Sequence, residues 1–361
     1  MKQSKILKTA VIGLGMGRNH ARRFSEMEES ELVGLADLDE ARLKEWEHLV
    51  ADSSHCYTDY REMLRKEKPD AVAVALPNFL HKPVTLDCLD AGAHVLCEKP
   101  MALNVEEAEA MKAKAVETGL QLGINLSYRK SIQALALKDL VDDGFLGEPY
   151  HAMSRWTRRN GFPGFGGWFG QKKMSGGGPL IDLGVHRLDL ALWLMGCPNP
   201  VSASASAHRR VGVPRAENAG RQFDVEDLAT GFIRLENGAS MIFEISWGNH
   251  QAEAEEQYTR VIGTKGAVVQ RNTDGHYTFT AEAHTDMSGH PVDPVVQQAG
   301  KKGLGAREQF LHQILDGKPV SPGMEDGLRI QRILDALYLS AEKGEEIKIA
   351  VPADARTHPA R

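Results

Sequence analysis

Short apolar runs alternate with longer amphipathic stretches through the first 125 residues of the chain. The apolar runs are brief and bounded by turn residues, which is typical of buried parallel strands. The strands that this pattern predicts are Ala10–Ile12, Leu32–Ala36, Ala71–Leu76, Ala93–Cys97 and Leu120–Asn125. The helices predicted between them include Tyr60–Lys66, Lys82–Ala91 and Val105–Thr118. This β-α alternation predicts a doubly wound parallel sheet with helices on both faces.

The pattern changes after about residue 145. Glycine and aromatic residues crowd residues 160–178, and one strong helix is predicted near Ile181–Met195. The β-like runs that follow are Val201–Ala207, Ala229–Leu235, Ala239–Trp247, Tyr258–Ile262, Ala267–Gln270 and His276–Thr280. The turn signals Glu236-Asn237-Gly238 and Thr264-Lys265-Gly266 join some of these runs as hairpins, which favours an antiparallel sheet.

The end of the chain returns to helical periodicity. Helices are predicted over Ala306–Leu315 and Met324–Lys343. Before them, Thr285–Gly303 is polar and rich in glycine, proline and glutamine, so we expect a mobile loop there. The chain therefore divides into a β-α half and a half richer in antiparallel strands.

The composition fits an ordinary soluble protein of more than one domain. A chain of 361 residues suits two domains of about 100–200 residues each. Its net charge of −6 provides no basic surface for nucleic acid, and no apolar stretch approaches the ~18 residues of a membrane span. The four cysteines include no Cys-x-x-Cys pair. The apolar run Thr9–Gly15 after three lysines imitates a short signal peptide, but a first buried strand explains it better. We therefore expect a cytoplasmic protein with reduced thiols and neither nucleic-acid nor membrane partners.

A glycine turn follows the first predicted strand. Gly13, Gly15 and Gly17 allow a tight turn there and let backbone N–H groups approach a pyrophosphate at the start of a helix. The third glycine comes one residue earlier than in the G-x-G-x-x-G pattern, and Arg18 stands in its usual place. The alternative is an ordinary turn between a strand and a helix.

Asp37 strengthens the nucleotide interpretation. It ends the second predicted strand, twenty residues after Gly17, where a carboxylate accepts hydrogen bonds from the adenosine ribose hydroxyls. A 2′-phosphate at this position would meet a like charge, so NAD is favoured over NADP. The alternative role for Asp37 is to cap the following helix, which Asp39 is equally placed to do.

Lys99 follows a buried strand and precedes a proline. Because the residue before a proline is driven toward extended backbone, the side chain should emerge at the carboxyl edge of the sheet, where ligands bind in open α/β folds. The alternative is a surface lysine in a turn, which is common.

Asp182, His186 and Asp189 recur at helical spacing, which places them on one face of the predicted helix. The glycines of residues 176–178 precede this helix and would let another backbone or a ligand come close. One alternative is a flexible linker before a helix that carries an internally paired histidine. Another is a metal site built from these three side chains, but no neighbouring cysteine or histidine supports it, and we predict no bound metal.

Together these motifs resemble the glucose–fructose oxidoreductase / inositol dehydrogenase (Gfo/Idh/MocA) family of NAD(P)-dependent dehydrogenases. The resemblance rests on an ordered set of motifs, which are Gly13–Gly17 with Asp37, Pro77-Asn78-Phe79-Leu80-His81, Glu98-Lys99-Pro100, Gly176-Gly177-Gly178 and Asp182-Leu183-Gly184-Val185-His186. It implies an α/β protein with an N-terminal Rossmann domain over residues 1–126 and a C-terminal α+β domain over 127–361. The second domain would hold a large, mostly antiparallel open sheet that forms a homodimer or homotetramer.

The resemblance also implies the site residues. The catalytic group would be Lys99, Asp182 and His186. The residues expected to contact NAD are Gly13, Gly15, Met16, Gly17, Asp37, Pro77, Asn78, His81, Glu98 and Asn125. Of these, Pro77, Asn78, His81 and Glu98 would line the nicotinamide end. The chain departs from the family in its shortened glycine turn and in Leu126-Ser127-Tyr128, which replaces an arginine-containing segment.

The expected roles within the catalytic group follow from ordinary acidities. An unassisted lysine is almost entirely protonated at pH 7, whereas an unassisted histidine is mostly neutral and ready to accept a proton. We therefore assign His186 as the general base and Lys99 as the cation that steadies the developing alkoxide. Asp182 would orient the substrate or His186.

Aromatic, arginine and amide side chains precede the glycine run, and they suit the C–H faces and hydroxyls of a sugar. The predicted substrate contacts are Tyr128, Arg158, Asn160 and Trp168. The alternative is a surface loop whose aromatic residues pack on the core. The favoured function is NAD-dependent oxidation of a secondary alcohol in a sugar, inositol, polyol or glycoside. An NAD-retaining glycoside hydrolase or eliminase and a non-catalytic NAD-responsive protein are the alternatives.

Overall fold

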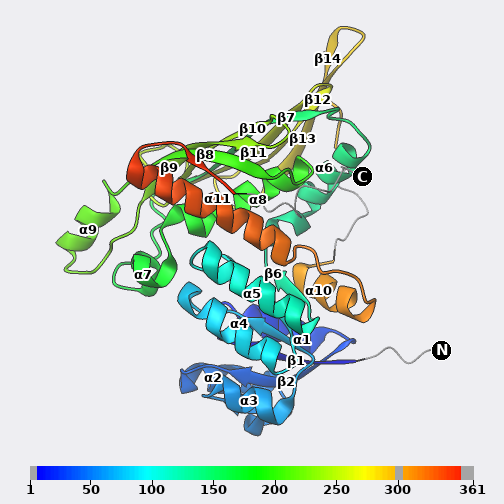
Figure 1. The fold of residues 1–361 in the computed structure, drawn as a ribbon, viewed down its shortest axis with the longest axis vertical. Coiled ribbons are helices and arrows are strands. Elements are labelled where there is room, and N and C mark those ends of the chain that lie inside the picture. Colours follow the sequence, from blue (N-terminus) through cyan, green and yellow to red (C-terminus); the bar gives the residue numbers. More distant parts are fainter. Residues whose placement is uncertain (1–5, 297–303, 351–361) are drawn as a thin grey trace. The chain divides into compact units, whose positions relative to one another are not determined.

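The computed structural model describes residues 6–296 and 304–350, which form two compact units (Figure 1). The first unit runs to Leu126 and takes in Leu304–Gln331. The second begins at Ser127 and takes in the chain from Arg332 to Ala350. The resemblance to the family implies one domain over residues 127–361, whereas the described residues of 304–331 pack with the first unit.

The first unit is a parallel sheet of six strands in the order β3-β2-β1-β4-β5-β6. Its strands are β1 (Leu7–Ile12), β2 (Ser30–Ala36), β3 (Cys56–Tyr57), β4 (Ala71–Val74), β5 (His94–Cys97) and β6 (Leu122–Ile124). Its helices are α1 (Arg18–Glu26), α2 (Glu40–Trp46), α3 (Tyr60–Glu67), α4 (His81–Asp90), α5 (Val105–Thr118), α10 (Ala306–Leu315) and the start of α11 (Met324–Lys343). This strand order is the doubly wound order that the alternation in the sequence predicts.

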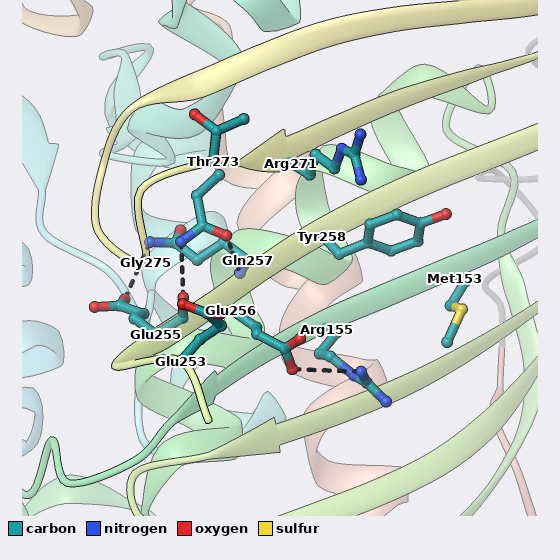
Figure 2. Close-up of a pocket in the computed structure, with 11 residues that line it drawn as sticks. Met153, Arg155, Glu253, Glu255, Glu256, Gln257, Tyr258, Arg271, Thr273 and Gly275 are labelled. Atoms are coloured by element: carbon teal, nitrogen blue, oxygen red, sulfur yellow. Dashed lines mark hydrogen bonds and ion pairs between the residues drawn. The ribbon is translucent and has the colours of Figure 1, made fainter. Parts of the chain in front are cut away.

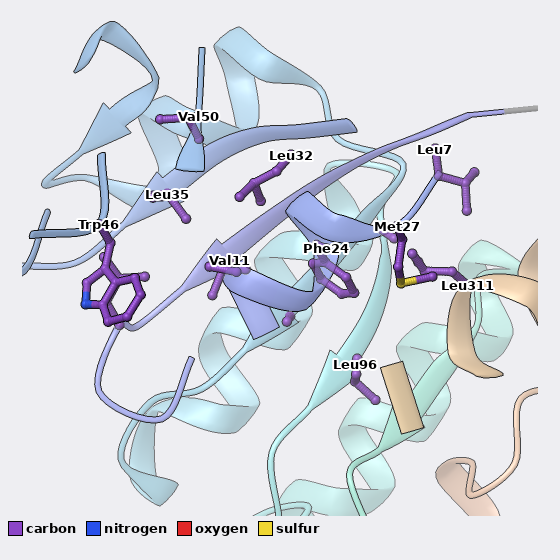
Figure 3. Close-up of a cluster of buried hydrophobic side chains, with 14 of the residues drawn as sticks. Leu7, Val11, Phe24, Met27, Leu32, Leu35, Trp46, Val50, Leu96 and Leu311 are labelled. Carbon is purple, nitrogen blue, oxygen red and sulfur yellow. The ribbon is translucent and has the colours of Figure 1, made fainter. Parts of the chain in front are cut away.

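A continuous apolar core lies under α1, α2 and α10 on one face of this sheet (Figure 3). Phe24 and Trp46 from the helices meet Val11 and Leu35 from the strands, and Phe310 of α10 belongs to the same cluster. Burial of this apolar surface explains why α10 packs with the first unit although it lies some 180 residues after Leu126 in the sequence.

The chain after α10 is also attached to the edge strand β6. Gly123 of β6 forms an isolated antiparallel bridge with Gly323, and the Ile124 N–H donates to the carbonyl of Pro322 at 3.1 Å. The Val320 N–H donates to Oε1 of Gln121 at 3.0 Å. These bonds satisfy backbone groups that an edge strand otherwise exposes.

The second unit is built on a nine-stranded sheet in the order β14-β13-β12-β11-β7-β10-β9-β8-β15. Its strands are β7 (Pro149–Arg158), β8 (Pro200–His208), β9 (Leu228–Leu235), β10 (Ser240–Ser246), β11 (Glu255–Gly263), β12 (Gly266–Asn272), β13 (Phe279–Met287), β14 (His290–Val292) and β15 (Ile347–Lys348). Its helices are α6 (Ile132–Asp142), α7 (Lys172–Ser175), α8 (Val185–Leu194), α9 (Gly212–Asn218) and the remainder of α11. The β7–β10 pair is parallel and the other pairs of this sheet are antiparallel. The predicted fold class is confirmed.

The hairpins of the second unit agree with the turn signals, but other elements differ from the prediction. The predicted turns join β9 to β10 and β11 to β12. The expected mobile loop Thr285–Gly303 is wrong at its start, because residues 285–287 continue β13 and pair with β14. Residues 297–303 of that loop lie outside the described residues. The run predicted over His276–Thr280 becomes a strand from Phe279 onward.

Two findings concern the wider class of protein. Among the residues that the structure describes, no helix is long and apolar enough to cross a membrane. All four cysteines are free thiols, and burial raises the pKa of Cys88 and Cys97.

Candidate functional site

The three glycines of the first turn differ in what a side chain would meet at each position. Gly13 has a positive φ of +88°, and a Cβ built on Gly17 would lie 1.9 Å from the carbonyl oxygen of Gly13. Both positions therefore need glycine for the turn itself. A Cβ built on Gly15 meets nothing within 4 Å. Gly15 thus leaves its backbone accessible from open space, as a dinucleotide-binding turn requires for the pyrophosphate. Despite the shortened spacing, the turn therefore has two glycines that its own backbone requires and one whose backbone is accessible to a ligand.

Two longer side chains border this turn. Met16 is exposed beside Gly15, and Nη1 of Arg18 donates to the carbonyl oxygen of Gly15 at 2.6 Å. Because α1 begins at Arg18, the guanidinium lies at the positive end of the helix. The residue that replaces the usual third glycine therefore adds positive charge where a pyrophosphate would bind.

Asp37 lies directly after β2 and is held by the turn. Its Oδ2 accepts from the Leu14 N–H at 2.6 Å, and its Oδ1 accepts from the Asp39 N–H at 2.9 Å. The cap of α2 is Asp39, which accepts from the N–H groups of Ala41 and Arg42. The alternative in which Asp37 caps this helix is therefore wrong.

A largely apolar cavity of about 260 Å³ lies beside Asp37. The residues that line it are Ile12, Ala36, Asp37, Leu38, Thr58, Tyr60, Arg61, Leu76, Leu80, Pro83 and Val84. A flat, weakly polar base suits such walls, and the carboxylate at the rim suits ribose hydroxyls. These residues therefore fit the adenosine end of a dinucleotide.

The carboxyl ends of β4, β5 and β6 carry the remaining predicted residues of this unit. Asn78 follows β4 and is buried, and Glu98 and Lys99 follow β5. Asn125 follows β6, and its N–H donates to the Cys97 carbonyl at 2.8 Å. Because the strands are parallel, these ends share one edge of the sheet with the glycine turn.

His81 is buried between two backbone carbonyl groups. It is fully buried, with Nδ1 2.7 Å from the carbonyl oxygen of Pro100 and Nε2 2.8 Å from that of Leu76. Burial lowers its pKa, although both carbonyls oppose this effect. The ring therefore connects the segments that follow β4 and β5, next to Lys99.

Glu98 is the centre of a buried polar group. Its Oε1 lies 2.8 Å from Nε2 of His20 and 2.7 Å from Nδ2 of Asn125. Burial alone would raise the pKa of Glu98, but its contacts with His20, Asn125 and Lys99 outweigh burial and lower it to about 2. Glu98 is therefore ionised at neutral pH.

In the second unit, Asp182 and His186 lie on adjoining helical turns. Leu180–Gly184 forms a single π-helical turn, and α8 continues from Val185. Oδ2 of Asp182 accepts from Nε1 of Trp247 at 3.0 Å. This indole N–H fixes the carboxylate of Asp182. The predicted helix is present, and its first turn is wider than an α-helix.

The glycine run before this helix is packed against protein atoms. A Cβ on Gly177 would lie 2.0 Å from the hydroxyl of Tyr338, and one on Gly178 would lie 2.1 Å from the carbonyl oxygen of Glu226. The buried carboxylate of Glu226 accepts from the N–H of Gly178 at 2.8 Å and from that of Leu180 at 3.1 Å. The run therefore admits the protein's own backbone, and its interpretation as a flexible linker is wrong.

Asp189 forms a buried ion pair with Arg129, which lies just after the predicted substrate residue Tyr128. Nε of Arg129 donates to Oδ2 of Asp189 at 2.8 Å. Asp189, the third side chain of the alternative metal site, is therefore already paired with Arg129. Across the described ranges, no group of three or more histidine, cysteine or acidic side chains is arranged to hold a metal ion.

Aromatic rings surround His186. The ring centroid of Tyr128 lies 4.9 Å and that of Trp156 lies 5.9 Å from the imidazole centroid. Arg187 is buried, and its guanidinium lies 4.7 Å from the centroid of the Tyr128 ring. Burial lowers the pKa of Arg187 to about 10. His186 thus lies against a cluster of aromatic rings.

Arg158 joins the same group of side chains. Its Nε lies 3.2 Å from Oε1 of Glu255, and its Nη2 donates to the hydroxyl of Tyr277 at 2.9 Å. Burial lowers the pKa of Arg158, but the charges of Glu255, Tyr277 and Asp182 outweigh burial and raise it. The charge of Arg158 is therefore balanced within the protein.

The other two predicted substrate residues have different contacts. Oδ1 of Asn160, an exposed residue, accepts from Arg215 at 2.8 Å. Trp168 stacks on Phe169 with ring centroids 3.8 Å apart. The structure adds Glu255 and Tyr277, which sequence reasoning misses because they come from β11 and from the chain before β13.

A further cavity of about 540 Å³ lies on β7, β11 and β12, as Figure 2 shows. Met153 and Arg155 line it and alternate along β7 with Ser154 and Trp156, which face α8 and its surroundings. Arg155 pairs there with Glu256 at 3.4 Å. None of the predicted catalytic, cofactor or substrate residues lines this cavity.

A parallel sheet with an open glycine at its first turn and a carboxylate beside an apolar cavity defines a dinucleotide-binding protein. The comparisons specify the family. Residues 7–126 match the model described as "Oxidoreductase family, NAD-binding Rossmann fold", and residues 134–269 match the GFO/IDH/MocA C-terminal domain.

Individual relatives agree with these matches. The chain is 32% identical over 358 residues to D-glucoside 3-dehydrogenase of Escherichia coli strain K12, covering 96% of this chain and 98% of the relative. The aldose-aldose oxidoreductase of Caulobacter crescentus, solved with glycerol, has a TM-score of 0.80 at 28% identity and covers 96% of this chain and 100% of its own. An enzyme of gentamicin A biosynthesis, solved with NAD, has a TM-score of 0.79 at 25% identity and covers 96% and 97%.

The chain belongs to the Gfo/Idh/MocA family and is an NAD(P)-dependent oxidoreductase. The resemblance inferred from the sequence motifs and the prediction of NAD as cofactor are confirmed.

Proposed function

We propose that this protein is an NAD-dependent dehydrogenase that oxidises a secondary alcohol of a sugar, polyol or glycoside. The observation that carries the proposal is the open backbone at Gly15 beside the apolar cavity at Asp37, in a chain that also bears Lys99, Asp182 and His186. The E. coli relative is named a D-glucoside 3-dehydrogenase and the Caulobacter one an aldose-aldose oxidoreductase, which supports a carbohydrate substrate.

The roles in the reaction follow from charge. NAD, when bound, supplies the hydride acceptor. His186 accepts the hydroxyl proton, because a neutral imidazole is available near pH 7. Lys99 stabilises the negative charge that develops on the oxygen. Asp182, fixed by the indole N–H of Trp247, orients the substrate or His186.

The surroundings of His186 favour a neutral substrate. Tyr128 and Trp156 offer aromatic faces that suit the C–H faces of a sugar ring. Arg158 is paired with Glu255, so this guanidinium contributes no unbalanced positive charge for a sugar acid or sugar phosphate. We expect Tyr128 and Arg158 to contact hydroxyl groups, and we expect weaker activity on anionic sugars.

The nine-stranded sheet is the proposed subunit interface. The side chains of β7 and β11 that face away from α8 include Met153 and Tyr258 beside charged residues. We propose a cytoplasmic homodimer or homotetramer that assembles through this face, as the resemblance to the family implies.

The proposal is tested by following NADH formation at 340 nm with inositols, aldoses, glycosides and sugar acids. We expect net reduction of NAD by a neutral sugar or glycoside. Lys99→Met and His186→Ala should each lower kcat by at least about 100-fold while NAD affinity stays nearly unchanged. Lys44→Met and His208→Ala change exposed residues of the same types and should leave kcat unchanged.

Full turnover in both site variants would contradict the assigned roles. Cleavage of a glycoside without net NADH, with NAD surviving gel filtration, would instead identify the NAD-retaining hydrolase alternative.

A further inference from the structure

Four side chains from distant parts of the first unit form one hydrogen-bonded row. Nε of Arg307, on α10, donates to Nδ1 of His20, on α1, at 2.9 Å. Nε2 of His20 lies 2.8 Å from Oε1 of Glu98, and Nδ2 of Asn125 donates to the same oxygen at 2.7 Å. The row runs from a helix outside the predicted cofactor half to the carboxyl end of β6.

The donors in this row are determined by the chemistry of its first member. A guanidinium donates hydrogen bonds and accepts none, so Nδ1 of His20 must accept from Arg307. The proton of a neutral His20 therefore lies on Nε2 and is donated to Glu98. His20 thus transmits the orientation of Arg307 to the carboxylate.

Glu98 in turn determines the orientation of the Asn125 amide. An ionised carboxylate accepts hydrogen bonds and donates none, so Asn125 must present its NH₂ group to Glu98. Its Oδ1 then points away from Glu98. This oxygen is buried and has no hydrogen-bond partner among the residues that the structure describes. A buried acceptor without a donor costs free energy unless a ligand supplies one.

The position of Asn125 indicates which part of the cofactor it meets. The adenosine cavity lies at the ends of β1 and β2, and the open glycine follows β1. In the observed order β3-β2-β1-β4-β5-β6, a dinucleotide that crosses the carboxyl edge brings its second base over β4 to β6. Asn125 ends β6, and Lys99, whose N–H donates to Oε2 of Glu98 at 3.3 Å, follows β5.

We propose that Arg307 and His20 are positioning residues that act through Glu98, and that they hold Oδ1 of Asn125 as the acceptor for the carboxamide N–H of the nicotinamide. The inference rests on binding of NAD by the first unit. The row thereby makes recognition of the reactive end of the cofactor depend on α10, a helix more than 180 residues beyond β6.

The test compares NAD with ADP-ribose, which keeps the adenosine, pyrophosphate and second ribose but lacks the nicotinamide. Calorimetry of Asn125→Ala and Arg307→Met should show NAD affinity about tenfold weaker and ADP-ribose affinity unchanged, because one hydrogen bond is worth about 1–1.5 kcal/mol. His20→Leu should behave in the same way. His20→Gln, whose amide can accept from Arg307 and donate to Glu98, should retain most of the NAD affinity.

Arg23→Met is the matched control. Arg23 pairs with Glu308, so this substitution removes another ion pair between α1 and α10 without touching the row. It should change the affinity of neither ligand. Equal weakening of NAD and ADP-ribose in Arg307→Met and His20→Leu would show a general structural effect and overturn the proposal, as would unchanged NAD affinity. A wild-type chain that binds neither ligand would overturn the nucleotide site and this proposal with it.

Discussion

The two glycine-rich segments of the protein use the same residue type for different purposes. In the first unit, Gly15 faces open space and nothing in the protein requires a glycine there. In the second unit, the space beside Gly177 is filled by Tyr338, and the space beside Gly178 is filled by the backbone of Glu226. A glycine that the fold does not need is the better sign of a ligand, because the space it leaves is available to one.

The buried glutamates beside these segments differ in a parallel way. Burial favours the neutral form of each, but the contacts of Glu98 with His20 and Asn125 outweigh this effect and lower its pKa. For Glu226, burial outweighs the N–H groups of Gly178 and Leu180, and its pKa is raised. The first glutamate is part of a charged row, whereas the second anchors a helix start.

The largest effect should come from Gly178→Ala. The added methyl would lie 2.1 Å from a backbone oxygen, so the chain must move apart. We expect a loss of about 3 kcal/mol in the free energy of unfolding, or failure to fold. Urea unfolding followed by circular dichroism measures it. A loss below about 0.5 kcal/mol would mean that the glycine run is not packed as described.

Gly15→Ala should weaken ligand binding while leaving the stability of the protein nearly unchanged. The methyl meets no protein atom, so the free energy of unfolding should change by less than about 1 kcal/mol. The methyl would occupy the space where the pyrophosphate approaches, so NAD and ADP-ribose should both bind at least about tenfold more weakly. Gly167→Ala, which also meets open space, is the control and should change neither quantity. Unchanged NAD affinity in Gly15→Ala would remove the distinction between the two segments.

Measured per pH unit, the pH dependence of stability is the smallest effect, and it should have opposite signs for the two glutamates. Glu98 stabilises the fold above its ordinary pKa of 4.5, and this contribution is lost as the pH falls from 4.5 toward 2. Relative to Glu98→Gln, the wild type should therefore gain stability with rising pH over this range. Relative to Glu226→Gln, it should lose stability as the pH rises above 4.5.

Each slope is at most about 1.4 kcal/mol per pH unit, since one proton is involved. Urea unfolding of the three proteins between about pH 3 and pH 7 measures both differences. Slopes of the same sign would contradict the assignment of opposite environments.

The first unit is more predictable from its sequence than the second, for a physical reason. Parallel strands buried on both faces are continuous apolar runs, and the residues at their ends share one edge of the sheet. Gly15, Asp37 and Lys99 can therefore be related from the order of the apolar runs alone. The central strand β7 of the second unit carries arginine and histidine between its buried residues, so it lacks such a run and is absent from the predicted strands.

The positioning residues also could not be predicted from the sequence. Arg307 and His20 are 287 residues apart, and neither belongs to a local motif that indicates the other. Helical spacing groups Asp189 with His186, but the partner of Asp189 is Arg129. Spacing predicts which residues share a helix face, and it does not predict which residue from another element neutralises them.

The most direct test of the catalytic assignment is a crystal structure with NAD and a bound glucoside. The quantities to measure are the distances from Nζ of Lys99 and from a ring nitrogen of His186 to the hydroxyl oxygen on the carbon next to the nicotinamide. The assignment predicts that both lie within hydrogen-bond reach, at about 2.6–3.2 Å. Two nitrogens on separate surfaces, with the hydroxyl held by other side chains, would contradict it.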